Sequence, residues 1–188
     1  MFARFGYAGF ALLALGCATA APQTLSPAPA RTAQPLPPRG NSGVPLPQLL
    51  LDRHNAQRSA AGVPPLVWDA RLAAAAADHA RSLSVTGQLV HSPRASRPGI
   101  GENLWVGTAG AYGPDAGIAS WVAERNDYRD GIFPHVSRTG NWLDVSHYTQ
   151  MIWRTTTHVG CASARSARWD ALVCRYSPKG NRDGQRPR

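Results

Sequence analysis

The sequence contains none of the common signatures of enzyme active sites. It has no GxSxG nucleophile elbow, no HExxH zinc motif and no phosphate-binding loop. Residues 99–104, GIGENL, begin like a dinucleotide-binding fingerprint, but the third glycine is missing and no strand-helix-strand unit surrounds them. Because no local motif encodes the chemistry, any functional site must be assembled from residues that are distant in the sequence.

The sequence also lacks an apolar run long enough for a permanent membrane span. Residues 5–15 are apolar, follow Arg4 and lead into small residues, and a spanning helix needs roughly 20 such residues. This pattern predicts a signal peptide over residues 1–20. The stretch LALGC resembles a bacterial lipobox, in which Cys17 becomes the lipidated first residue of the mature chain, while residues 18–20, ATA, offer an ordinary cleavage site as the alternative.

Lysine is almost absent, since Lys179 is the only one among 20 basic residues, and the formal net charge is +9. The arginines are scattered along the chain. A nucleic-acid-binding face would combine clustered basic residues with aromatic ones, so we predict no nucleic-acid partner. We expect a solvated surface with some attraction to anionic lipid or envelope polymers.

Acidic residues are missing from a proline-rich stretch near the N-terminus. Residues 22–47 hold half of the 16 prolines and no Asp or Glu, a composition that cannot bury a core. We therefore predict a disordered spacer at residues 21–47, one domain at residues 48–181, and a disordered polar tail at residues 182–188.

Cysteine is scarce, with three residues in the chain. If Cys17 is lipidated or removed, Cys161 and Cys174 remain. Both lie in segments rich in β-branched and apolar residues around a turn at residues 166–168, so strand pairing could bring their Cβ atoms within bonding distance. Export favours a disulfide between them, and two buried free thiols are the alternative.

The periodicity of apolar residues predicts segregated helices and strands around a small antiparallel sheet, which indicates an α+β layered domain. Asp69 is a plausible N-cap for the alanine-rich second helix. The predicted helices cover residues 47–59, 70–83 and 115–128, and the predicted strands cover residues 103–106, 152–164 and 169–177.

Four ionisable residues lie in locally unusual settings. His91 ends a glycine-containing loop, Glu102 lies between Gly101 and an asparagine, Glu124 follows a tryptophan on the third helix, and His147 precedes a Tyr-Thr-Gln run. Two imidazoles and two carboxylates could bind Zn²⁺ or exchange protons if the fold brings them together. Spacing alone does not show that it does, and each of them singly is typical of a surface or capping residue.

Seven stretches resemble, in order, the signatures of the CAP superfamily, also called the SCP domain: cysteine-rich secretory proteins, antigen 5 and pathogenesis-related proteins. The chain is similar to a bacterial single-domain member. The stretches are HNAQR at 54–58, GVPPLVWDARLAAAAADHA at 62–80, HS at 91–92, GENLW at 101–105, WVAE at 121–124, HYTQMIWRTTTHVGCA at 147–162 and VCRYSPKGN at 173–181.

The resemblance implies a three-layer α-β-α sandwich around a small, mainly antiparallel sheet. It implies a cleft lined by the four ionisable residues and a disulfide between Cys161 and Cys174, with HYTQMIW as a core strand whose His147 end enters the cleft. Ser146 departs from the family pattern, in which Gly is common before HYTQ. The further disulfides of larger eukaryotic members cannot form, because their cysteines are absent.

The resemblance leaves three functional interpretations open. In the first, the protein is an exported or lipid-anchored envelope protein whose cleft holds Zn²⁺ or another divalent cation, and an apolar groove binds lipid- or sterol-like ligands or another envelope component. In the second, it is a metal-dependent or acid/base hydrolase in which His91 and His147 hold the metal while Glu102 or Glu124 activates water. The third is an interaction protein with a vestigial cleft. The sequence indicates no oligomeric state.

Overall fold

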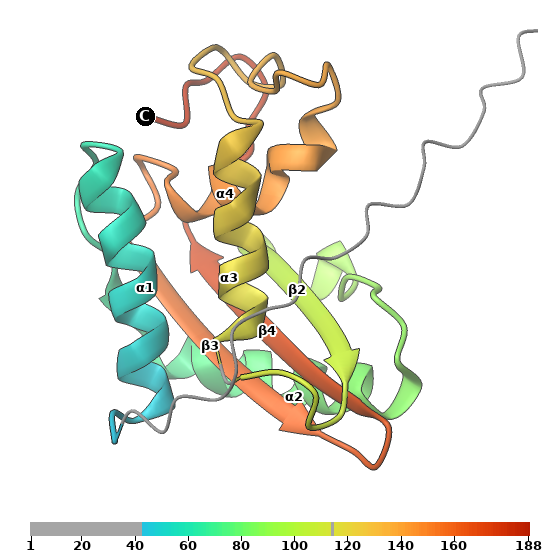
Figure 1. Ribbon diagram of the computed structural model, residues 1–188. Helices are drawn as coiled ribbons and strands as arrows, with labels where there is room; N and C mark the ends of the chain where they lie inside the picture. Colours follow the sequence, from blue (N-terminus) through green and yellow to red (C-terminus); the bar gives the residue numbers. More distant parts are fainter. Residues whose placement is uncertain (1–42, 114) are drawn as a thin grey trace, which may run out of the picture. The chain divides into compact units, whose positions relative to one another are not determined.

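The computed structural model describes residues 43–113 and 115–188, as a four-stranded sheet with helices on both sides (Figure 1). The predicted signal peptide, Cys17 and the spacer up to residue 42 lie outside this part of the chain. In order, the elements are α1 (Leu46–Ala60), β1 (Val67–Trp68), α2 (Ala70–Thr86), η1 (Arg94–Ser96), β2 (Gly101–Thr108), α3 (Ala116–Ala123), η2 (Glu124–Asn126), η3 (Trp142–Val145), α4 (Ser146–Met151), β3 (His158–Arg165) and β4 (Trp169–Ser177). Within the described residues, no helix is both long and apolar enough to span a bilayer.

The strands are ordered β1-β3-β4-β2, so β2 lies at one edge of the sheet. The two-residue β1 runs parallel to β3, and the other neighbours are antiparallel. Cys161 and Cys174 lie directly opposite each other on β3 and β4, with their Cα atoms 4.1 Å apart, and they form a disulfide. The predicted disulfide is present, and the alternative of two free thiols is wrong.

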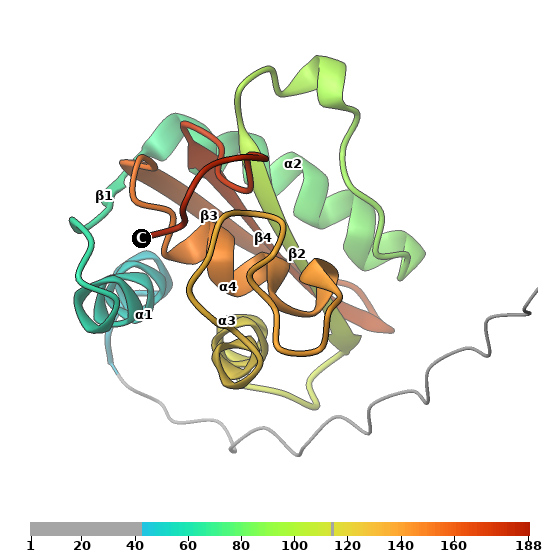
Figure 2. The same cartoon turned by 90° about the horizontal axis from the view of Figure 1, so that it is seen from above.

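The sheet is the middle layer of an α-β-α sandwich. Seen from above, α2 covers one face, and α1, α3 and α4 cover the other (Figure 2). The core on the α2 side contains Ala76, Ala80, Leu83, Leu104, Ala171 and Val173. The core on the opposite side includes Leu50, Ile118, Trp121, Met151, Val159, Leu172 and Tyr176. The predicted three-layer architecture is therefore confirmed.

Local sequence explains how α2 docks. The side chain of Asp69 accepts hydrogen bonds from the backbone N–H groups of Arg71 and Leu72 at 2.8 and 3.0 Å, as an N-cap does. The helix passes directly over Gly160 of β3, where an added Cβ would lie 2.2 Å from the backbone nitrogen of Ala73. Glycine at this position is what allows the helix to lie so close to the sheet.

A single buried arginine connects α1 to the segment between α4 and β3. Arg58 is 0% exposed and makes no ion pair in the described part of the chain. Its guanidinium donates hydrogen bonds to the backbone carbonyls of Pro64, Met151, Trp153 and Thr156. Met151 ends α4, and the other three residues lie in irregular backbone, where the Trp153 carbonyl also accepts from the backbone N–H of Thr156 at 3.0 Å. Arg58 therefore supplies hydrogen bonds that regular secondary structure does not provide there.

The prediction that HYTQMIW, residues 147–153, forms a core strand is wrong. Its first five residues lie in the short helix α4, Ser146–Met151. Residues 148–151 are all buried, and the polar Gln150 accepts a hydrogen bond from the backbone of Gly180 at 2.8 Å. The segment SHYTQM mixes polar and apolar residues without a helical or a strand period, so periodicity could not distinguish this buried helix from a strand.

Several boundaries also differ from the predictions. The strand predicted at residues 152–164 begins only at His158, because residues 152–157 form turns and irregular backbone after α4. The third helix ends as an α-helix at Ala123 and continues as the 3₁₀ turn Glu124–Asn126. The first helix starts at Leu46, so residues 46–47 belong to its first turn and not to the spacer.

The prediction of a disordered tail at residues 182–188 is wrong as well. The backbone N–H of Gly184 donates to the carbonyl of Phe133 at 2.9 Å, and the guanidinium of Arg188 pairs with the carboxylate of Asp130. The polar composition of the tail suggested solvent exposure. It instead supplies hydrogen-bonding partners for the loop that contains Phe133.

Candidate functional site

The four predicted cleft residues form two separate His–Glu pairs. Nδ1 of His91, in the loop after α2, lies 2.9 Å from Oε1 of Glu102 at the start of β2. Nδ1 of His147, in the first turn of α4, lies 2.6 Å from Oε1 of Glu124, just after α3. Each pair therefore joins residues from different elements of the fold.

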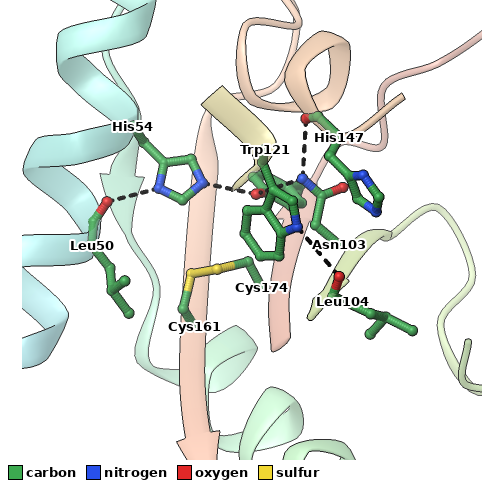
Figure 3. The surroundings of a disulfide bond; sticks show 9 residues. Leu50, His54, Asn103, Leu104, Trp121, His147, Cys161 and Cys174 are labelled. Carbon is green, nitrogen blue, oxygen red and sulfur yellow. Dashed lines mark hydrogen bonds between the residues drawn. A yellow bond between two sulfur atoms is a disulfide. The ribbon is translucent and has the colours of Figure 1, made fainter. Parts of the chain in front are cut away.

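The two pairs approach the edge strand β2 from opposite layers. Glu102 is oriented toward α2, whose His79 lies 4.0 Å from its carboxylate. Glu124 and His147 belong to the α3–α4 layer on the other face. Trp121 of α3 lies at the strand, because its indole N–H donates to the Leu104 carbonyl at 3.3 Å and its ring stacks on His147 at 5.8 Å between centroids (Figure 3).

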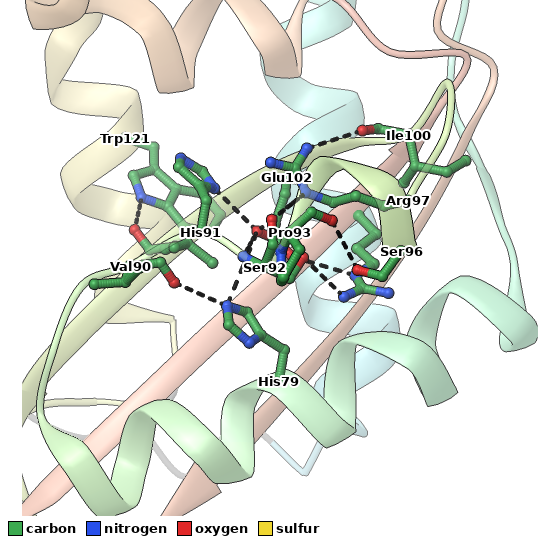
Figure 4. A network of polar contacts seen from close by, with 12 residues as sticks. His79, Val90, His91, Ser92, Pro93, Ser96, Arg97, Ile100, Glu102 and Trp121 are labelled. Carbon is green, nitrogen blue, oxygen red and sulfur yellow. Dashed lines mark hydrogen bonds and ion pairs between the residues drawn. The ribbon is translucent and has the colours of Figure 1, made fainter.

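Glu102 is fully buried and surrounded by donors (Figure 4). Besides His91, it accepts hydrogen bonds from the Ser92 backbone at 3.0 Å, the Ser92 hydroxyl at 2.7 Å and Arg175 Nε at 3.3 Å, and Arg97 Nε lies at 3.6 Å. Burial alone would raise the pKa of this carboxyl, but the hydrogen bonds from His91 and Ser92 outweigh it and lower the pKa to about 2. Glu102 is therefore a fixed anion and a poor proton acceptor.

Glu124 has a second role, because it caps the short helix α4. Its Oε2 accepts hydrogen bonds from the backbone N–H groups of His147 and Tyr148 at 2.9 and 3.0 Å. The same carboxylate that orients the imidazole of His147 therefore also satisfies the start of the helix that carries it. Both oxygens of Glu124 are already engaged.

A buried hydrogen-bonded chain supports His147 from behind (Figure 3). The amide nitrogen of Asn103 donates to the His147 carbonyl at 3.1 Å and to the Tyr176 hydroxyl at 3.2 Å, and that hydroxyl lies 2.8 Å from Nε2 of His54. Nδ1 of His54 must donate to the Leu50 carbonyl at 2.7 Å, so its Nε2 accepts from Tyr176. Burial lowers the pKa of His54 to about 4, which keeps the ring neutral.

The sequence did not predict that the residues of this hydrogen-bonded network belong to the site. His54 and Asn103 lie inside the HNAQR and GENLW stretches, which marked them without giving them a role. His54 and Tyr176 are 122 residues apart in the sequence, and no local pattern predicts the hydrogen bond between them.

The four cleft residues do not form one compact ligand set. Within the described part of the chain, the group of three or more potential ligands whose donor atoms lie within 4.8 Å of one another is His54, Cys161 and Cys174. Those two sulfurs are joined in a disulfide, and both ring nitrogens of His54 are hydrogen-bonded. Metal binding by cysteine needs thiolates, so this group does not fit a metal in the oxidised protein.

Each cleft histidine nevertheless retains one ligand atom. Both use Nδ1 for the partner carboxylate, and no described group hydrogen-bonds to Nε2 of His91 or of His147. Because an ionised carboxylate only accepts hydrogen bonds, Nδ1 carries the proton, and Nε2 of the neutral ring offers its lone pair. This tautomer is the one that a metal-ligating histidine needs.

Comparison with known proteins agrees with this arrangement of elements. The sequence model of the cysteine-rich secretory protein family, CAP, matches residues 51–176. This chain belongs to the CAP family. The PR-1 type pathogenesis-related protein of Sambucus nigra is 41% identical over 143 residues, which cover 75% of this chain and 81% of that protein. Pathogenesis-related leaf protein 4 of Solanum lycopersicum is 39% identical over 142 residues, 75% and 82% of the two chains.

Solved CAP structures share the fold. The crystal structure of NaASP2 with Zn²⁺ matches with a TM-score of 0.63 at 22% identity, covering 80% of this chain and 89% of that chain. Na-ASP-1 matches with a TM-score of 0.59 at 25% identity, covering 74% of this chain and 40% of that one. The predicted CAP family is confirmed, and in this CAP domain the His–Glu pairs flank the edge strand.

Proposed function

We propose that this protein is an exported CAP-domain binding protein in which His91 and His147 hold a divalent cation, Zn²⁺ or a similar ion. The observation that carries the proposal is the pairing of each Nδ1 with its own carboxylate, which leaves Nε2 available on both rings. In metal sites, carboxylates placed in this way orient the histidine and raise its basicity. NaASP2, a structural relative, was crystallised with Zn²⁺.

In this proposal Glu102 and Glu124 orient the histidines and are not themselves ligands. Their oxygens are already engaged by other donors, so coordination would cost several hydrogen bonds. A bound cation would act as a Lewis acid toward a ligand. The protein's own residues hold the Nδ1 protons and keep both rings in place.

The hydrolase alternative is less well supported by the geometry. A pKa of about 2 makes Glu102 too weak a base for activating water at neutral pH. The Ser92 hydroxyl donates to Glu102 and accepts from Arg175, and no histidine activates it. Binding needs neither a general base nor a nucleophile, so we favour a binding role. A lipid- or sterol-like ligand stays a prediction.

The metal proposal predicts that the double variant His91→Ala/His147→Ala loses Zn²⁺ binding in calorimetry at neutral pH. Glu124→Gln is expected to weaken binding by about 10–100-fold, the usual cost of losing an orienting partner. The matched control is His158→Ala, an exposed histidine of β3 whose Nδ1 contacts the hydroxyl of Thr157. If the double variant bound Zn²⁺ as tightly as the wild type, the proposed site would be wrong.

We also propose that a lipid on Cys17 anchors the protein, which rests on the N-terminal sequence alone. Wild-type protein is then expected to partition into the detergent phase, and Cys17→Ser is expected to move it to the aqueous phase or leave it as unprocessed precursor. Equal partitioning of both forms would favour ordinary cleavage after residues 18–20.

A further inference from the structure

A pocket lies away from the His–Glu pairs, beside the end of β2 that does not carry Glu102. It has a volume of about 470 Å³ and is lined by residues of β2, the loop before α3, Gly117 of α3 and the β3–β4 hairpin, and we call it the hairpin pocket. None of the four cleft residues lines it. A volume of this size falls within the range of small-molecule sites.

Two aromatic rings form adjoining apolar walls of this hairpin pocket. Trp105 of β2 is only partly buried, and Tyr112 meets it edge to face, with centroids 5.5 Å apart and ring planes at 86°. Gly107 makes this arrangement possible, because an added Cβ would lie 2.5 Å from the Trp105 ring and 2.9 Å from Tyr112. The pocket therefore presents aromatic surface in two directions.

Strand register places polar groups beside the aromatic rings. Ser163, which is exposed, and Trp105 are both cross-strand partners of Leu172, so all three share one face of the sheet. Next to them, at the hairpin end, Arg165 donates through Nε and Nη2 to both carboxylate oxygens of Asp170. The pocket thus combines aromatic walls with a hydroxyl and a neutralised ion pair.

The polar groups restrict the kind of occupant. An acyl chain would cover the charged Arg165–Asp170 pair without offering it a hydrogen bond, which is unfavourable. An ionised ligand would attract one member of the pair and repel the other. A neutral molecule with an apolar face and a hydroxyl-rich rim avoids both problems, since the face can stack on an aromatic ring while the rim hydrogen-bonds to Ser163 and Arg165.

We propose that the hairpin pocket binds a neutral saccharide of about disaccharide size. One pyranose ring stacks its C–H face on Trp105 or Tyr112, and its hydroxyl groups reach the ion pair. The proposal does not depend on metal binding at His91 and His147, because the two sites share no lining residue.

The test is titration of the full chain with cellobiose, maltose and N,N′-diacetylchitobiose in the presence of a chelator. Binding is followed by the NMR shift of the Trp105 indole N–H. We expect at least one of these sugars to bind with a dissociation constant on the order of millimolar and to shift this signal. Absence of any shift with all three sugars would overturn the proposal, as would selective binding of decanoate in their place.

Two variants separate the site from an effect on folding. Trp105→Ala removes the stacking surface, and Ser163→Trp fills the pocket from an exposed position. Both are expected to weaken sugar binding at least 10-fold, and Ser163→Trp is expected to leave the melting temperature unchanged. The control is Trp142→Ala, a partly exposed tryptophan in η3 outside the pocket. Equal sugar affinity in Ser163→Trp and the wild type would contradict the proposed location.

Discussion

Replacing Arg58 with methionine is expected to lower the free energy of unfolding by about 3–5 kcal/mol. Methionine fills a similar volume but donates no hydrogen bond. The carbonyls of Pro64, Met151 and Thr156 would then lose the guanidinium as donor, while that of Trp153 would keep the backbone N–H of Thr156. Each unsatisfied buried group costs about 1–3 kcal/mol. Removing a buried cation, whose pKa burial lowers to about 10, offsets part of this loss.

The matched control is Arg53→Met on the same helix. Arg53 has a side chain 56% exposed and makes one ion pair, with Asp115 at 2.9 Å, so its loss should cost less than about 1 kcal/mol. Urea denaturation of the three proteins under identical conditions measures the difference. If Arg58→Met lowered the free energy of unfolding as little as Arg53→Met does, the four carbonyls would not depend on the guanidinium.

Between pH 4.5 and pH 2 the wild-type protein is expected to lose about 3 kcal/mol of stability through Glu102. Its pKa is about 2 in the folded protein against 4.5 in the unfolded chain, and each pKa unit corresponds to about 1.4 kcal/mol. The unfolded chain takes up the proton at higher pH, so protonation favours unfolding. The stabilisation is complete above pH 4.5 and disappears as the pH falls toward 2.

Glu102→Gln tests this origin of the acid sensitivity. The variant is expected to be less stable at pH 7 by about 3–5 kcal/mol, because Arg175 and Arg97 lose a buried counter-charge, and to show a much flatter pH dependence below 4.5. Asp78→Asn, at an exposed carboxylate of α2, is the control. A Glu102→Gln variant with the wild-type slope in this range would contradict the assignment.

His54 acts in a different pH range. Its pKa of about 4 in the folded protein lies below the ordinary value of 6.5. The unfolded chain therefore binds the proton first, and the contribution of the neutral ring to stability is lost as the pH falls from 6.5 to 4. The two effects can therefore be separated in one acid titration of stability.

The sequence predicted features whose cause is local. Asp69 as an N-cap, the alanine face of α2 and the β-branched strands around residues 166–168 all act within a few positions of the chain, and the structure contains each of them. The pairing of Cys161 with Cys174 could also be predicted from the sequence, because a short turn between two strands brings their residues opposite each other.

The errors came from tertiary contacts that override local patterns. Residues 147–151 lie in a helix that shows no apolar period, because its polar Thr149 and Gln150 are buried with hydrogen-bonding partners at Asn181 and Gly180. The tail after Arg182 is ordered because the carbonyl of Phe133 and the carboxylate of Asp130 accept hydrogen bonds from it. Neither partner could be identified from the tail itself.

By itself, the sequence identified two histidines and two glutamates, within seven stretches that resemble the family signatures, as candidate site residues. Only the tertiary structure decided how they are paired. The pairing of His91 with Glu102 and of His147 with Glu124, and the engagement of both carboxylates by further donors, depend on where α4 and the loop after α2 meet β2. Contacts of that kind join residues far apart in the chain. They depend on how whole helices and strands pack on the sheet, and the spacing of residues along the sequence does not reveal this packing.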